Sequence, residues 1–252
     1  MNPVPPNPAA KLWIFDFDNT LAALEREVDW PGSRRELEAF LRAEGVDGEI
    51  FVEIPKGNLP LYAALHTRWL RDRDGNSSRA VPSRDVAEAL LRRASEIVER
   101  HELIGAERAA PTPGAIELLN AVAAQDGIVM IVTSNSSRTV ARWLQLYAVS
   151  DLVRVVIGRD SLLALKPSPE MVLRALELAD VPAVDAVFVG DSEADLGAAR
   201  AAGVGFYGIA PKDSARDRLI ATGASEIFAS PGALGAHLKL ASLQSAAETE
   251  SK

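Results

Sequence analysis

The stretch that decides the fold is LWIFDFDNTL, residues 12–21 of this 252-residue chain. Its first part, Leu12–Phe15, is a continuous apolar run, which is typical of a strand buried on both faces of a parallel sheet. Similar runs recur later, at Ile128–Val132, Val153–Ile157, Ala186–Val189 and Val204–Ile209. Amphipathic helical stretches separate these later runs. Strands and helices in alternation predict a doubly wound α/β fold around a parallel sheet.

Residues 23–110 break this alternation, because they contain helical pieces near 33–44, 60–72 and 83–103. We therefore predict a helical domain over 23–110, inserted into an α/β core formed by 1–22 and 111–252. Interleaved arginines and glutamates on the last of these helices indicate a solvated face. Three irregular segments are also predicted: a disordered arm at 2–8, a loop at Asp72–Ser78 and a frayed tail after Ala241.

Helix ends are predicted from capping residues. Helix starts are expected at Ser33, which forms a capping box with Glu36, and at Ser83, Thr112, Ser168 and Ser192. Pro113 and Pro169 favour the first helical position at two of these starts. Gly203 is expected to end the helix that begins near Ser192.

The composition limits the possible functions. A net charge of −8 and a pI of about 5.0 indicate an acidic surface, which repels nucleic-acid phosphates and anionic membranes. The chain contains no cysteine, which excludes disulfides, thiolate metal sites and a cysteine nucleophile. No apolar run approaches the roughly 18 residues of a membrane span, and the N-terminus lacks an apolar signal core. We expect a cytoplasmic enzyme whose partners are neither nucleic acids nor membranes.

Two carboxylates, Asp16 and Asp18, directly follow the first predicted strand. At this spacing both side chains of an extended segment point the same way, and ligands bind at the carboxyl ends of strands in open α/β sheets. Two like charges at such a place require a cation or a proton. The alternative is that these residues only form a turn.

A second acidic group, GDSEAD at 190–195, follows the predicted strand Ala186–Val189. Its acids would lie at the same rim of the sheet as Asp16 and Asp18. Oxygen-rich sites of this kind suit Mg²⁺. The alternative is that the acids only cap the following helix.

Thr133, Ser134 and Lys166 complete the set of candidate residues. Thr133 and Ser134 follow the run Ile128–Val132, where hydroxyls and backbone N–H groups at a helix start form an anion site. Lys166 precedes a predicted helix start, where its ammonium would neutralise a phosphate. Capping and a surface position are the plainer explanations. Because each motif lies beside a strand end or a helix start, we expect all of them to meet at one rim.

These motifs resemble those of the haloacid dehalogenase-like hydrolase superfamily, and its phosphatase branch in particular. DFDNTL at 16–21 matches the first motif, Thr133 the second, Lys166 the third and GDSEAD at 190–195 the fourth. The resemblance implies a Rossmann-like core, and the insert is similar to the α-helical cap domain of subfamily I, near phosphoglycolate phosphatase. Asn19 stands where many relatives have glycine, a change that removes no catalytic group.

The resemblance implies Mg²⁺-dependent hydrolysis of a small phosphate monoester through an aspartyl-phosphate. Asp16 would be the nucleophile, and Asp18 the general acid and then the base. Mg²⁺ would be held by Asp16, by Asp18 through its backbone carbonyl and by Asp191, with Asp195 supporting these ligands.

Lys166, Thr133 and the backbone N–H of Ser134 would stabilise the charge of the transferring phosphoryl group. The insert is expected to close over the site about hinges near Leu21–Leu24 and Ala109–Gly114. Two alternatives stay open, a phosphomutase of the same fold and a non-catalytic binding or regulatory protein. The sequence leaves open which small phosphorylated metabolite is the substrate, and the oligomeric state.

Overall fold

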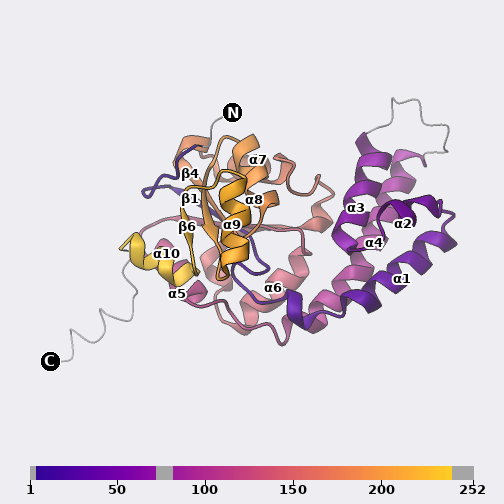
Figure 1. The fold of residues 1–252 in the computed structure, drawn as a ribbon, viewed down its shortest axis with the longest axis horizontal. Helices are drawn as coiled ribbons and strands as arrows, with labels where there is room; N and C mark the ends of the chain where they lie inside the picture. Colours follow the sequence, from indigo (N-terminus) through magenta and orange to yellow (C-terminus); the bar gives the residue numbers. More distant parts are fainter. Residues whose placement is uncertain (1–3, 72–81, 240–252) are drawn as a thin grey trace.

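The computed structural model describes residues 4–71 and 82–239, and these form an α/β core and a helical cap at opposite ends of the long axis (Figure 1). The predicted loop at Asp72–Ser78 and the predicted frayed tail after Ala241 lie outside the described residues. Residues 4–8 are not a free arm, because Pro5 and Pro6 pack against Gly205 so closely that a Cβ there would lie 2.5 Å from Pro6 Cα. None of the described helices has the length and apolar character needed to cross a membrane.

The core contains a six-stranded sheet in which all neighbouring strands are parallel, in the order β3-β2-β1-β4-β5-β6. The strands are β1 (Leu12–Phe15), β2 (Ile128–Val132), β3 (Val153–Ile157), β4 (Ala186–Gly190), β5 (Gly205–Ile209) and β6 (Ile227–Phe228). Strand β1 pairs with both β2 and β4 and is buried along its whole length. This explains its uninterrupted apolar sequence, and the predicted fold class is confirmed.

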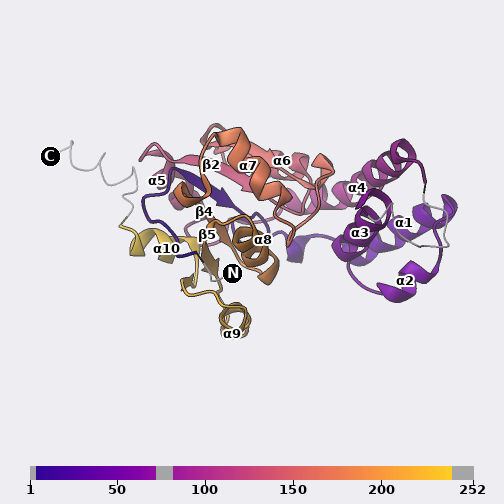
Figure 2. The ribbon, with the colours of Figure 1, turned by 90° about the horizontal axis from the view of Figure 1, so that it is seen from above.

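Helices cover both faces of the sheet (Figure 2). On one face, Leu12 and Ile14 pack with α7 (Glu170–Ala179) and α8 (Glu193–Ala201). On the other, Trp13 and Phe15 pack with α5 (Ala115–Ala123), α6 (Ser137–Leu146) and α10 (Pro231–His237). Helix α9 (Asp213–Ala221) follows β5, and short 3₁₀ turns lie at Glu25–Glu27, Ser150–Leu152, Arg159–Ser161 and Ala183–Asp185. The alternating side chains of a single strand therefore supply both halves of the core.

The cap is formed by helices that follow β1 in the chain. They are α1 (Trp30–Ala43), α2 (Glu49–Glu53), α3 (Asn58–His66), a π-helical turn (Thr67–Arg71) and α4 (Arg84–Ala106). The predicted start of a helix at Ser83 is confirmed, since its side chain accepts a hydrogen bond from the Val86 N–H at 3.4 Å. The predicted helical insert is therefore present in the structure, although its exact boundaries stay a prediction.

Three predicted helix starts, at Ser33, Thr112 and Ser168, are wrong. At the last of these, Pro169 is the N-cap and α7 begins at Glu170. Helix α1 begins three residues before Ser33, because Asp29 accepts the Gly32 N–H at 2.8 Å and caps the helix there. The N-cap of α5 is Gly114, and the Thr112 hydroxyl donates to the carbonyl of Thr20 instead. In each case a nearby residue, and not the expected one, is the N-cap of the helix.

Helix α4 belongs to both lobes of the molecule. It packs against α1 and α3 of the cap and also against α6 of the core. Ion pairs join α4 to α6, with Arg138 2.8 Å from Glu99 and Arg142 2.6 Å from Glu107, the residue that ends α4. The cap is therefore attached to the core through α4 and not only through the two connecting segments of the chain.

Candidate active site

Three charged side chains from distant parts of the sequence meet at the carboxyl end of the sheet. Asp16 follows β1, and its backbone N–H donates to Val189 O of β4 at 2.8 Å. Lys166 Nζ lies 2.5 Å from Asp16 Oδ1 and 2.6 Å from Asp195 Oδ1. The three side chains are only 9%, 5% and 0% exposed, for Asp16, Lys166 and Asp195 respectively. The plainer explanation of Lys166 as a surface residue is excluded.

The charge of Lys166 is maintained by its neighbours. Burial alone would lower the pKa of this ammonium, but the carboxylates of Asp16 and Asp195 outweigh burial and raise its pKa. The ammonium also donates to Val132 O at 3.3 Å, at the end of β2. A permanently protonated lysine therefore lies between two acids and beside the strand that leads to Thr133.

The two carboxylate oxygens of Asp195 have different partners. Its Oδ2 accepts from the N–H groups of Asp191 at 3.2 Å and Ser192 at 3.1 Å, and from the Ser192 hydroxyl at 2.7 Å, which completes a capping box at the start of α8. Its Oδ1 faces Lys166. Gly190 allows this approach, because a Cβ there would lie 2.7 Å from the Asp195 side chain. The N-cap of α8 and the charged cluster thus depend on one carboxylate.

Asp16, Asp191 and Asp195 form a group able to hold a metal ion, with one carboxylate oxygen from each within 4.8 Å of the others. Burial, and then the charges of Asp16 and Asp195, raise the pKa of Asp191 to about 9. Burial and Asp195 likewise raise the pKa of Asp16 to about 6, although Lys166 opposes them. A cation would relieve this repulsion, and a donor set made only of oxygens fits a hard cation such as Mg²⁺.

Asp18 is held apart from this three-carboxylate group. Its Oδ1 accepts the backbone N–H of Glu25 at 2.8 Å, where the chain enters the cap. Burial raises the pKa of Asp18 to about 7, with the Glu25 hydrogen bond opposing and the Asp16 charge adding to the rise. The backbone at Asn19 is left-handed, with φ of 59°, and its side chain donates to Glu25 Oε2 at 3.0 Å. Asparagine tolerates this conformation better than most residues other than glycine.

Thr133 and Ser134 lie directly after β2, beside the strand that carries Asp16. Thr133 is fully buried, and its hydroxyl accepts the Asn135 N–H at 3.1 Å and donates to Asn135 Oδ1 at 3.0 Å. The carbonyl of Ser134 accepts from Arg159 Nη1 at 2.8 Å. The turn at 133–135 is therefore fixed by hydrogen bonds within it and by the guanidinium of Arg159. The structure brings the sequence-predicted residues to one edge of the sheet.

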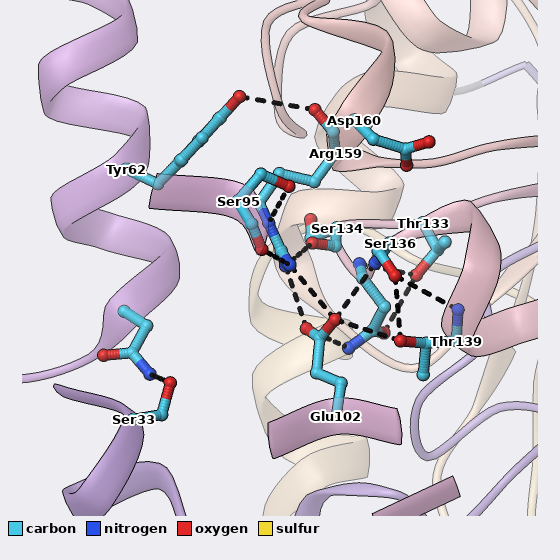
Figure 3. Close-up of polar contacts among 12 residues, drawn as sticks. Ser33, Tyr62, Ser95, Glu102, Thr133, Ser134, Ser136, Thr139, Arg159 and Asp160 are labelled. Carbon is cyan, nitrogen blue, oxygen red and sulfur yellow. Dashed lines mark hydrogen bonds and ion pairs between the residues drawn. The ribbon is translucent and has the colours of Figure 1, made fainter. Parts of the chain in front are cut away.

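Sequence reasoning missed two residues beside this turn, Glu102 of α4 and Arg159 after β3 (Figure 3). Both side chains are completely buried and form an ion pair, with Arg159 Nη1 2.8 Å from Glu102 Oε1. The predicted solvated face of this helix is wrong at Glu102. A signal was present, because Glu102 follows Leu91, Ser95 and Val98 at helical spacing, on the buried side of α4.

Comparison with known proteins supports the fold and the motifs. The family model described as haloacid dehalogenase-like hydrolase matches residues 10–203. A phosphoglycolate phosphatase of Pseudomonas putida is 28% identical over 218 residues, covering 81% of this chain and 71% of that protein. Another, from Pseudomonas fluorescens Pf-5, is 38% identical over 92 residues, covering 36% of this chain and 34% of that protein. The match to the latter therefore spans about a third of that relative's length.

Solved structures share the architecture. A haloacid dehalogenase-like hydrolase from Bacteroides fragilis superposes with a TM-score of 0.62 at 20% identity, covering 89% of this chain and 99% of that one. CbbY from Rhodobacter sphaeroides, determined in complex with phosphate, gives 0.60 at 24% identity, with 92% and 100% covered. At these identities the likeness establishes the fold.

Proposed function

We propose, from the premise that this chain belongs to the haloacid dehalogenase-like hydrolase family, that it hydrolyses a small phosphate monoester through an aspartyl-phosphate on Asp16. One observation carries the proposal: the ammonium of Lys166 lies between the carboxylates of Asp16 and Asp195, next to Asp191. A nucleophilic carboxylate held beside a fixed cation is what transfer of an anionic phosphoryl group requires.

In the first step, a carboxylate oxygen of Asp16 attacks phosphorus while the bond between phosphorus and the ester oxygen breaks. The departing oxygen takes the proton of Asp18, so the product leaves as an alcohol. The Glu25 N–H orients Asp18 for this transfer, and the pKa of about 7 keeps a substantial protonated fraction near neutral pH. Lys166 stabilises the negative charge that spreads over the phosphoryl oxygens.

In the second step, water replaces the Asp16 oxygen on phosphorus. The carboxylate that Asp18 has become accepts a proton from this water, whose oxygen then attacks phosphorus. Inorganic phosphate leaves, and the Asp16 carboxylate and the protonated Asp18 are restored. We assign the N–H of Ser134 to bind phosphoryl oxygens in both steps, and the Thr133 hydroxyl to do so once its proton turns away from Asn135 Oδ1.

The residues suited to hold Mg²⁺ are Asp16 and Asp191, with Asp18 contributing its backbone carbonyl. When bound, the ion supplies positive charge at the phosphoryl oxygens. Asp195 binds Lys166 and two backbone N–H groups, so its role is to position the ammonium and the start of α8.

The test is a phosphate-release assay with Mg²⁺ over a panel of phosphorylated metabolites. Phosphoglycolate heads the panel because relatives are phosphoglycolate phosphatases. We expect Asp16→Asn to fold and to lose turnover. Asp185→Asn is the matched control, since within the described part of the chain the Asp185 side chain pairs only with Lys11, at 2.8 Å on the surface. Turnover by Asp16→Asn at the wild-type rate would refute the proposed nucleophile.

The same panel separates hydrolysis from phosphomutase chemistry, because a mutase would return an isomerised sugar phosphate in place of free phosphate. The expectation of a cytoplasmic location stays a prediction. So does the expectation, which rests on the acidic charge of the chain, that neither nucleic acid nor a membrane is a partner.

A further inference from the structure

The buried pair of Glu102 and Arg159 joins the cap to the turn that carries Thr133 and Ser134 (Figure 3). All five N–H donors of the Arg159 guanidinium have acceptors. Nε donates to Ser95 Oγ at 3.1 Å and Nη2 to Ser95 O at 3.2 Å, both on α4. Nη1 donates to Ser134 O at 2.8 Å. The remaining two donors bind Glu102 at 2.8 and 3.1 Å. One side chain of the core thus holds α4 and the turn together.

Glu102 binds the same turn directly. Its Oε1 accepts from Asn135 Nδ2 at 3.0 Å, and its Oε2 accepts from the Ser136 N–H at 3.1 Å and the Thr139 hydroxyl at 3.4 Å. Asn135 is the residue whose backbone and side chain fix the Thr133 hydroxyl. A carboxylate of the cap therefore accepts hydrogen bonds from three core residues, Asn135, Ser136 and Thr139, which closely follow the predicted phosphate-binding residues.

The cap also contacts the segment between β3 and Lys166. The Tyr62 hydroxyl of α3 donates to Arg159 O at 3.3 Å, and His66 Nε2 lies 2.9 Å from Leu162 O. Both side chains come from one face of α3. Two cap helices therefore hold the two core segments that lead to Ser134 and to Lys166.

These contacts make a displaced cap costly. Withdrawing α4 would leave the Arg159 guanidinium without Glu102 and Ser95, and would leave the Asn135 amide and the Ser136 N–H without their acceptor. Unpaired buried charges and donors are strongly unfavourable. The turn cannot keep its described conformation at low cost when α4 is away, so the two positions are linked.

We propose that the Glu102–Arg159 pair couples the docking of α4 to the geometry of the 133–136 turn, so that the site binds a phosphoryl group with full affinity only while α4 is docked. Glu102 and Arg159 are positioning residues, since they act through Ser134, Asn135 and Ser136. The inference rests on the proposed function only in taking this turn as the phosphate-binding segment. Because coupling is reciprocal, phosphate bound at the turn must also favour docked α4.

The first test uses wild-type protein, so it does not depend on a variant that folds. Amide hydrogen exchange is measured with Mg²⁺, with and without saturating inorganic phosphate. We expect slower exchange at residues 133–136 and also in α4 around residues 95–102. Protection confined to the core segments, with α4 unchanged, would overturn the coupling.

The second test measures inorganic phosphate as a competitive inhibitor of 4-nitrophenyl phosphate hydrolysis by Glu102→Gln and Arg159→Lys. Gln keeps the shape of Glu102 but turns an acceptor into a donor, and Lys keeps the charge of Arg159 but loses the planar fork. For each variant we expect at least tenfold weaker inhibition by phosphate and a matching rise in KM. Folded variants with inhibition within twofold of wild type would contradict the proposal.

The matched control is Arg138→Gln, which breaks the Arg138–Glu99 ion pair between α6 and α4 without removing a contact of the turn. Its inhibition by phosphate is expected to stay within twofold of wild type. An equal loss in this variant would show that α4 packing in general, and not the buried pair, sets the affinity.

The outcomes separate the two proposals. Wild-type protein whose α4 responds to phosphate, but which hydrolyses no ester, would contradict the proposed function and leave the coupling standing. Wild-type protein that hydrolyses esters, while α4 does not respond, would contradict the coupling alone.

Discussion

Replacing Trp143 and Tyr147 by phenylalanine, singly and together, tests how the chain is anchored where it returns from the cap to the core. Both side chains donate to the carbonyl of Ala109, the Trp143 indole at 2.9 Å and the Tyr147 hydroxyl at 3.1 Å. Ala109 and Trp143 are fully buried. The carbonyl therefore keeps one donor in each single variant and loses both in the double variant.

The energies follow from this geometry. Trp143→Phe loses one hydrogen bond, about 1 kcal/mol, and some core packing, about 1 kcal/mol more. Tyr147→Phe loses about 0.5–1 kcal/mol, because the carbonyl stays paired with Trp143. The double variant adds the cost of an unpaired buried carbonyl, about 1–3 kcal/mol. We therefore expect the double variant to lose about 3.5–6 kcal/mol, clearly more than the sum of the single losses.

The assay is urea unfolding of all four proteins, followed by fluorescence of the remaining tryptophans and by circular dichroism. The coupling energy is the loss in the double variant minus the two single losses. A coupling below about 0.5 kcal/mol, the usual limit of additivity, would refute the reasoning that this carbonyl needs one of the two donors.

Other predictions concern the charged cluster. Lys166→Met removes the cation between Asp16 and Asp195, so phosphate release should fall at least about a hundredfold; a smaller loss in folded protein would contradict its role. Asp195→Asn should lower the free energy of unfolding by about 2–4 kcal/mol, and unchanged urea denaturation would count against the described contacts. Gly190→Ala should also destabilise, because the new Cβ would lie 2.7 Å from Asp195; normal stability and turnover would show that this approach is not needed. Chelation of divalent cations should abolish turnover and added Mg²⁺ restore it, whereas turnover in chelator would contradict a metal at Asp191.

The sheet is the part of the fold that the sequence predicts best. A central parallel strand is buried on both faces, so Leu12–Phe15 and Ile128–Val132 stand out as apolar runs of the right length. Strand β6 has only two residues, Ile227 and Phe228, and such a short run carries no periodic signal. The prediction for the start of α1 is wrong for a different reason. Asp29 and Ser33 both suit a helix cap, and in the fold the Ser33 hydroxyl instead accepts a hydrogen bond from Asn58 Nδ2 at 2.9 Å.

The same distinction applies to the site. Asp16, Lys166 and Asp191 lie next to strand or helix ends, so local sequence and the topology of a parallel sheet suffice to bring them together. Arg159 and Glu102 are 57 positions apart. Helical spacing places Glu102 on the buried side of α4, but Arg159 resembles an ordinary surface charge in its own segment. Only the packing of α4 beside the core brings them together, and no local pattern encodes that packing.

The two connections between core and cap lie against each other, with the Ala23 N–H donating to Ala110 O at 2.9 Å and the Thr112 N–H to Leu21 O at 2.9 Å. For protein engineering this resembles a modular junction, since excising the insert leaves ends that a short turn can join. A derivative without the insert would nevertheless leave the guanidinium of Arg159 without its ion-pair partner Glu102. Transplanting a foreign lid onto this scaffold therefore calls for at least two simultaneous edits, one at the junction and one at Arg159.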